Sequence, residues 1–392
     1  MSVSVAFPFV TVVTDTSALR PAVQRAPGVL AVVGPTGTAA QGGSVAADTP
    51  TRVADGEEAA TFFSSTSRGT TASNPLYDAL KLALIQTPAP NTVYGVRVGD
   101  SGFASALAAL EAADDVTIVT LAGVHPERTA GETDPFAAAA LTALVALKDH
   151  VETMSAAGNK RIGVAMIDPS FPRGNTYTDA LNTGAASLAS SRMVLIAARG
   201  AVGDAGVAAA AAMAGYPPSV SMVLKQVNGV QLPLAGQFGP AEIRALSEKG
   251  FVPIIDPALI SGETLHLAEG RTFKPGDPLQ YIDTVRTLDD IEFRLKAGLI
   301  GLVGDARITR SGLITLKARI EGILGVVQRE QAIDGFRIQI PVLDILSIPE
   351  DARTPADRKT VKDARDARAV AVLLEVTLGP ATHRVDVQLF VN

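Results

Sequence analysis

The chain of 392 residues contains no cysteine and no tryptophan, and aromatic residues make up only 5% of it. Without cysteine it can form no disulfide, no thiolate metal site and no thiol nucleophile, which fits a reducing compartment. The chain is nevertheless globular in composition, because 47% of its residues are apolar and 19% are charged. Alanine and valine are expected to fill its interior.

An excess of basic residues is also lacking. The formal net charge is −6 and the pI is near 5.4, so the chain has no global positive field that would attract a nucleic acid. It shows no secretory signal, and its most apolar stretch, Ala205 to Tyr216, is about half as long as a bilayer requires. We therefore expect folding in the cytoplasm, with no nucleic-acid partner and no membrane insertion.

Motifs that carry chemistry are missing as well. None of the four histidines lies at a metal-binding spacing, and we expect each to be an ordinary loop or surface residue: His125, His150, His266 and His383. Gly34 to Gly37 follows a predicted strand, but it has neither a phosphate-loop ending nor a dinucleotide spacing, so we interpret it as a turn.

Two aspartates, Asp168 and Asp256, each precede a proline at the end of a predicted strand. A carboxylate there could be catalytic, but an Asp-Pro turn is the simpler interpretation. The chain has no Gly-x-Ser-x-Gly elbow. We therefore predict no catalytic, cofactor-binding or metal-binding residue and no cofactor.

Strand and helix patterns alternate between residues 28 and 255. Apolar runs predict strands at 28–33, 93–98, 116–121, 161–167, 193–198 and 251–255. Helical patterns fall between them, at 57–63, 75–85, 103–112, 134–156, 205–216 and 240–250. This succession predicts an α/β fold with a mostly parallel central sheet and flanking helices.

The pattern changes after Pro278. Two helices with continuous apolar stripes follow each other within residues 279–330. Residues 350–368 carry many charges of both signs and are expected to form either a solvated loop or an exposed helix, and a strand follows at 370–378. A length of 392 residues favours two or three packed units, and this region is expected to be an α+β C-terminal domain.

Both ends of the chain alternate with a period of two, which is typical of half-buried strands. The apolar positions are Val3, Val5, Phe7 and Phe9 at one end and Val385, Val387, Leu389 and Val391 at the other. An extended terminal segment can supply a missing strand to the sheet of another molecule. The alternative is that both ends pair within their own fold.

The order of these segments resembles the sheath proteins of contractile phage tails and related contractile injection particles. The resemblance covers most of the chain from about residue 20. It rests on apolar patterns of low specificity that occur in a fixed order, and not on an invariant motif. Its pieces are 114–119 with Gly123-Val124, 160–169, Tyr216-Pro217-Pro218-Ser219, 240–254, 279–333, 374–380 and 385–391. The long charged stretch 350–368 departs from the family, and Pro8 limits N-terminal pairing to an edge position.

The resemblance implies a body of the sheath subtilisin-like type and two terminal strand arms. The implied organisation is an N-terminal arm at 1–20, an α/β body at 21–275, a C-terminal α+β domain at 276–382 and a C-terminal arm at 383–392. In this family each subunit lends its arms to neighbours, so that strands of different subunits complete one small sheet. Contraction is then expected to be a rigid-body rotation of compact domains with the arms still connected.

The resemblance also implies a structural subunit, not an enzyme, of a virion tail or injection particle made in a bacterial or archaeal cytoplasm. Its expected partners are further copies, an inner tube protein, and baseplate and tail terminator proteins. We place the tube-facing surface on the helix 311–330, which presents Lys317, Arg319 and Arg329 outside its apolar stripe. The alternative for these three residues is an ordinary solvated helix face.

Two other classes of protein remain open from the sequence. One is an α/β enzyme or ligand-binding domain whose site lies in the strand-end loops near Gly34, Gly123 and Asp168. The other is an adhesive or capsid-like shell protein, which would also polymerise. The shape of the polymer distinguishes a sheath from a shell.

Overall fold

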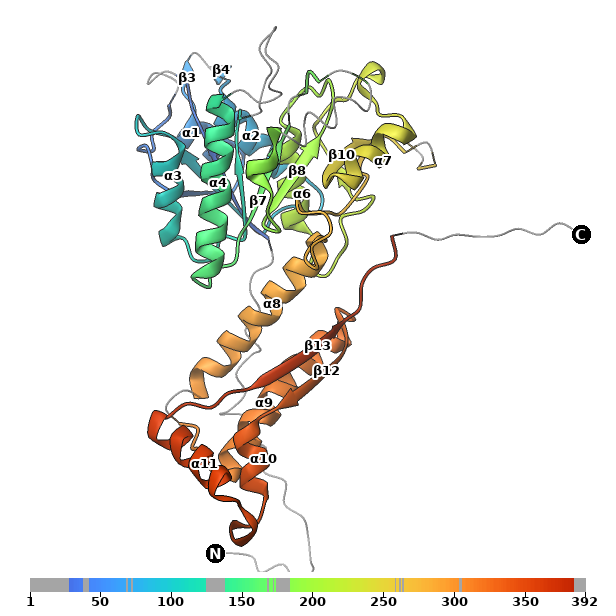
Figure 1. The fold of residues 1–392 in the computed structure, drawn as a ribbon. Helices are drawn as coiled ribbons and strands as arrows, with labels where there is room; N and C mark the ends of the chain where they lie inside the picture. Colours follow the sequence, from blue (N-terminus) through green and yellow to red (C-terminus); the bar gives the residue numbers. More distant parts are fainter. Residues whose placement is uncertain are drawn as a thin grey trace, which may run out of the picture.

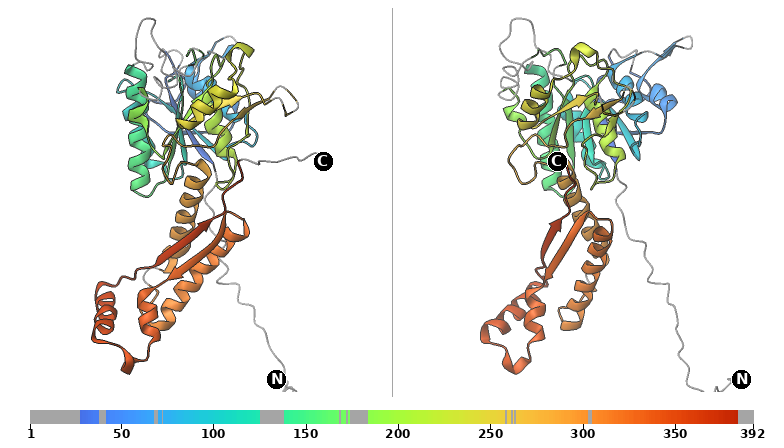
Figure 2. Two further views of the ribbon diagram at one scale, coloured as in Figure 1. Left: turned by 45° about the vertical axis from the view of Figure 1, so that its right-hand side comes forward. Right: turned by 90° about the vertical axis from the view of Figure 1, so that its right-hand side faces the viewer.

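The computed structural model describes residues 28–37, 42–67, 70–71, 73–124, 138–167, 169–171, 173, 184–257, 259–260, 262, 264–302 and 305–383. Figure 1 shows an α/β body at the top and a slender C-terminal module below it, joined by one long helix, α8 (Ile282–Leu299). Both views of Figure 2 show the same two-part shape.

The body is built on a nine-stranded sheet in the order β2-β5-β1-β6-β7-β8-β10-β11-β9. Six neighbouring strands are parallel: β5 (Thr92–Arg97), β1 (Val29–Gly34), β6 (Ile118–Leu121), β7 (Ile162–Met166), β8 (Met193–Ala197) and β10 (Phe251–Ile255). Short antiparallel strands form the two edges: β2 (Thr51–Val53), β11 (Leu265–Leu267) and β9 (Gln226–Val227). The prediction of a mostly parallel central sheet is confirmed.

Helices cover both faces of the sheet. One face packs on α1 (Gly56–Phe63), α2 (Pro75–Leu84) and α6 (Ala205–Gly215), and the other on α3 (Phe103–Ala109), α4 (Ala138–Ala156) and α7 (Pro240–Glu248). In β1, Leu30 and Val32 belong to the first core, whereas Val29, Ala31 and Val33 belong to the second. Burial on both faces explains why these strands are apolar without interruption. A further antiparallel pair of short strands, β3 (Thr66–Ser67) and β4 (Thr70–Thr71), lies at the top of the body in Figure 1.

The alanine-rich helix α6 allows very close packing between the helix and the strands. Residues 205–214 are all buried. Gly28, just before β1, has a φ of +77°, and a Cβ there would lie 1.7 Å from the carbonyl oxygen of Ala214. Only glycine fits this position. Within the described residues no helix combines the length and the apolar character needed to cross a membrane.

The C-terminal module contains α9 (Arg310–Arg329), β12 (Ile333–Gln339), α10 (Pro341–Ser347), α11 (Pro355–Ala367) and β13 (Leu373–Leu378). Strands β12 and β13 form a separate antiparallel two-stranded sheet that packs on α9. Helices α10 and α11 form a small second cluster at the far end of the module (Figure 1). Of the two structures expected for residues 350–368, most of the segment forms the exposed helix.

Candidate assembly site

The two-stranded sheet of the C-terminal module is covered on one side only. Phe336, Ile338, Leu374, Val376 and Leu378 face α9 and are partly buried. The other side is exposed, and Leu373 keeps 55% of its surface in solvent. Two strands with a single covered face form a marginal sheet.

Each strand of this sheet has an outer edge that no other strand of the described residues covers. Within the described residues, β12 and β13 pair only with each other. Each strand therefore has outward-pointing N–H and C=O groups, which are a template for strand addition. The apolar arm residues expected to provide such strands lie outside the described residues: Val3, Val5, Phe7, Phe9, Val385, Val387, Leu389 and Val391.

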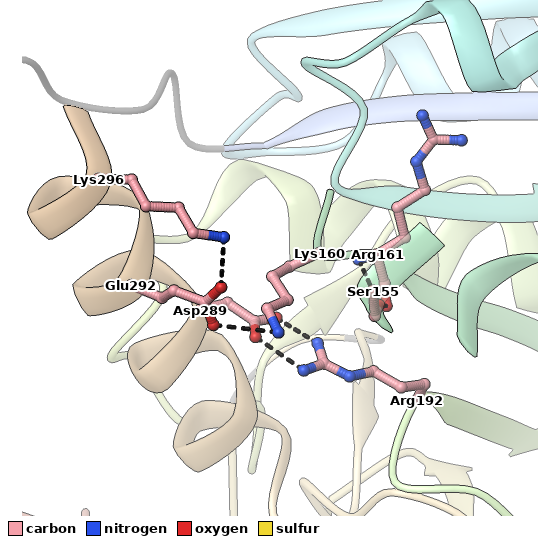
Figure 3. Close-up of polar contacts among 7 residues, drawn as sticks. All are labelled: Ser155, Lys160, Arg161, Arg192, Asp289, Glu292 and Lys296. Atoms are coloured by element: carbon pink, nitrogen blue, oxygen red, sulfur yellow. Dashed lines mark hydrogen bonds and ion pairs between the residues drawn. The ribbon is translucent and has the colours of Figure 1, made fainter. Parts of the chain in front are cut away.

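Ionic contacts fix helix α8 to the body (Figure 3). Arg192, just before β8, forms a bidentate pair with Asp289, and its Nη2 lies 2.8 Å from Oδ1. Lys160, just before β7, lies 3.0 Å from Glu292. The positive groups thus come from the amino ends of the parallel strands, and the negative groups lie on one side of α8. We call these two pairs the ionic joint.

A buried arginine on α8 adds to the joint. Arg286 donates from Nη2 to the carbonyl oxygen of Tyr216 at 2.7 Å. Burial lowers the pKa of Arg286 to about 10, although the carboxylates of Asp289, Asp290 and Asp283 act in the opposite direction. The guanidinium therefore stays charged at neutral pH. Because the first half of α8 is held in this way and the second half packs on α9, α8 belongs to both parts of the molecule.

The residues expected to face an inner tube lie on α9. Arg329 is exposed at the end of the helix, next to Gly325. Lys317 lies 3.9 Å from Glu321 on the same helix, and Nε of Arg319 donates to the carbonyl oxygen of Gly298 at 3.3 Å. Side-chain exposure is compatible with both interpretations of these residues, a tube-facing surface and a solvated face.

The loops considered for an alternative enzyme site lie at the carboxyl edge of the large sheet. Gly34 is the last residue of β1. The N–H of Gly123 donates to the carboxylate of Asp204 at 3.2 Å. Asp168 lies outside the described residues. A cavity of about 730 Å³ adjoins this edge and is lined by Gly123, Met166 and Asp204 among others. Asp204 caps the start of α6 through two N–H groups. The described residues contain no cluster of three or more His, Asp or Glu side chains that could hold a metal ion.

The expectation that each histidine is an ordinary loop or surface residue is wrong for two of them. His150 is buried on α4, and His266 is buried on β11. His125 lies outside the described residues. His150 contacts the fully buried Arg161, and Nη1 of Arg161 lies 2.7 Å from Nε2 of His150. Arg161 also donates to the carbonyl oxygens of Leu110 and Ala113. Since a guanidinium only donates, Nε2 accepts and the imidazole is neutral.

This pair predicts a loss of stability in acid. Burial, and secondly the charge of Arg161, lowers the pKa of His150 to about 4, from about 6.5 in the unfolded chain. Between these values the unfolded chain binds a proton that the folded chain does not, so the free energy of unfolding falls by about 2.5 kcal/mol as the pH drops from 6.5 to 4. Urea denaturation at several pH values across this range measures the fall in the free energy of unfolding. His150→Gln, which keeps an acceptor but does not titrate, should remove this part of the slope, and an unchanged slope would contradict the assignment.

Comparisons with known proteins agree on one fold. No protein-family model and no curated protein sequence matches the chain. Among solved structures, the contracted helical sheath of the anti-feeding prophage is 13% identical with a TM-score of 0.66, covering 99% of this chain and 100% of its own. The contracted PVC sheath of an extracellular contractile injection system is 12% identical with a TM-score of 0.67, covering 100% and 99%.

A crystal structure of a sheath tail protein from Desulfitobacterium hafniense is also similar. It is 11% identical with a TM-score of 0.56, and the alignment covers 85% of this chain and 93% of that one. At these identities the likeness concerns the fold. Since it spans the α/β body, α8 and the C-terminal module together, the chain has the fold of the subunits of contractile sheaths.

Proposed function

We propose that this chain is the structural subunit of a contractile sheath, which polymerises helically around an inner tube and contracts to drive that tube through a target envelope. One observation carries the proposal: the fold matches sheath subunits over nearly the whole length of both chains. Two of the neighbouring structures are contracted sheaths, which supports contraction as the motion. The proposed work is mechanical and involves no catalysis.

The open edges of the β12–β13 sheet support the proposed mode of assembly. In this mode, terminal arms 1–20 and 383–392 of adjacent subunits add strands to these edges. The body at 21–275, of the sheath subtilisin-like type, and the C-terminal domain at 276–382 move as rigid pieces. Contacts of this head-to-tail kind do not close on themselves and therefore generate a helix.

Three further partners follow from this assembly: the inner tube, the baseplate and the tail terminator. We propose that α9 faces the tube through Lys317, Arg319 and Arg329, whose positive charges would meet acidic groups there. The finished particle is a virion tail or an injection particle, assembled in the cytoplasm of a bacterium or archaeon.

Electron microscopy of the purified chain tests the function. At high concentration the chain should form hollow tubes with helical order, because the open edges and the arms are present in every copy. Lys317→Glu with Arg329→Glu should form the same tubes, since these residues are assigned to the lumen. A small closed oligomer would contradict the proposal and favour the α/β enzyme or ligand-binding domain. Closed shells would favour the capsid-like alternative.

A further inference from the structure

The chain does not leave the molecule where β13 ends. After Leu378 it turns at Gly379-Pro380 and returns to the body, as the red trace in Figures 1 and 2 shows. The N–H of Gly379 bonds to the carbonyl oxygen of Ala332, 3.4 Å away. Ala381 and Thr382 are exposed, and His383 then contacts the body.

Two residues of the body hold the His383 side chain. Nε2 of His383 lies 2.8 Å from Oγ of Ser221, and the imidazole meets the ring of Tyr281 edge to face, with centroids 5.2 Å apart. We call these three residues the His383 clasp. It joins segments 162 residues apart in sequence, so local propensity alone does not produce it.

The two body residues of the clasp are themselves held in place. Oγ of Ser221 accepts the N–H of Val223 at 3.3 Å, which orients the hydroxyl. Tyr281 directly precedes α8, and the guanidinium of Arg271 lies 5.5 Å from its ring. The clasp therefore attaches the returning chain to the root of α8, beside the junction of the body and the C-terminal module.

The clasp shortens the free C-terminal chain. With His383 held, the residues beyond it are 384–392, which span about 30 Å when extended. With His383 released, the free chain starts just after Gly379 and can point in many more directions. A shorter chain from a fixed origin has a higher effective concentration at any target within its reach.

We propose that the His383 clasp is a positioning device that fixes the origin and direction of the C-terminal arm, and so selects the neighbouring copy that the arm reaches. This inference rests on the proposed sheath function. One hydrogen bond and one aromatic contact are each modest in strength. The clasp thus restrains the arm without locking it, and it can yield when neighbouring copies move.

Assembly measurements test the clasp. His383→Ala should raise the critical concentration for tube formation about tenfold, as expected from losing both contacts. Ser221→Ala should raise it less, and adding it to His383→Ala should have no further effect. The matched control is Thr382→Ala, which alters an exposed neighbour and should change nothing. A critical concentration within twofold of the parent for His383→Ala would overturn the proposal.

A second measurement examines the monomer. Because the chain has no cysteine, Arg384→Cys and Glu248→Cys give two unique spin-label sites, one in the arm and one on α7. His383→Ala should broaden the distance distribution between them while the thermal melting temperature stays unchanged. An equally narrow distribution would overturn the clasp.

Removal of the arm separates the two proposals. If a chain lacking 385–392 still forms tubes, the arm-based sheath function fails. If that truncation blocks assembly but His383→Ala does not weaken it, only the clasp is wrong.

Discussion

Deleting Val385 to Asn392 is expected to give a folded monomer that forms no tubes at any concentration at which the parent assembles. The two cores of the body and those of the C-terminal module are built from buried side chains within the described part of the chain, which ends at His383. Each ladder hydrogen bond contributes about 1 kcal/mol net, so losing four to six of them at every subunit contact removes about 5 kcal/mol per link. Sedimentation measures assembly, and circular dichroism measures folding.

Two single substitutions sharpen this test. Adjacent N–H groups of a strand point to opposite sides, and proline lacks the donor. At least one of Val387→Pro and Gln388→Pro should therefore block assembly, whereas Gln388→Ala should not. If the truncated chain unfolds instead, the terminal strand belongs to its own core and the exchange of arms is refuted.

Replacing Asp289 by alanine is expected to lower the free energy of unfolding by about 3 kcal/mol. The pair with Arg192 is almost buried, with 15% and 11% of the two side chains exposed. Removing one partner leaves the other charge largely buried and without its counterion, which is costly. The loss should appear in urea denaturation, because α8 must detach from the body as the body unfolds.

A charge swap and a surface pair provide the controls. Arg192→Asp combined with Asp289→Arg should recover part of the lost stability, since the pair is restored with reversed polarity. Asp363→Ala removes an equally close partner from Lys359 on α11, but that pair is exposed and the change should not be measurable. Equal losses of stability for Asp289→Ala and Asp363→Ala would mean that the ionic joint stabilises the protein no more than an exposed surface pair does.

The body could be predicted from the sequence because its elements are long and strongly patterned. Val29–Gly34 is buried on both faces, and Asn74 and Pro75 begin α2 with the expected cap, in which Asn74 accepts the N–H of Tyr77 at 2.9 Å. The edge strands β2, β9 and β11 were missed, because two or three residues show no period and their pairing depends on the completed sheet.

Strand β12 was missed for a different reason. Its register shifts between Ile333 and Gly335, so the apolar positions before and after this irregularity are out of phase and the alternation is hidden. For α11, the Lys359–Asp363 and Lys362–Asp366 pairs at helical spacing were a usable signal in favour of the helix.

The ionic joint and the clasp depend on tertiary structure. Arg192 and Asp289 are 97 positions apart, and nothing in their local sequence indicates that they meet. By contrast, the change of pattern after Pro278 is visible in the sequence itself, and the division into a body at 21–275 and a C-terminal domain at 276–382 stays a prediction.

Helix α8 joins the body to the C-terminal module, so its tilt sets the position of that module. Its 18 residues are about 27 Å long at 1.5 Å per residue. A tilt of about 10° at its root would displace its far end by about 5 Å, which is the spacing between two strands of a sheet. If neighbouring copies are linked by added strands, as proposed, a flexible base of α8 would move an incoming strand out of reach. Stiffness at the base of α8 would then set the accuracy of each link between copies.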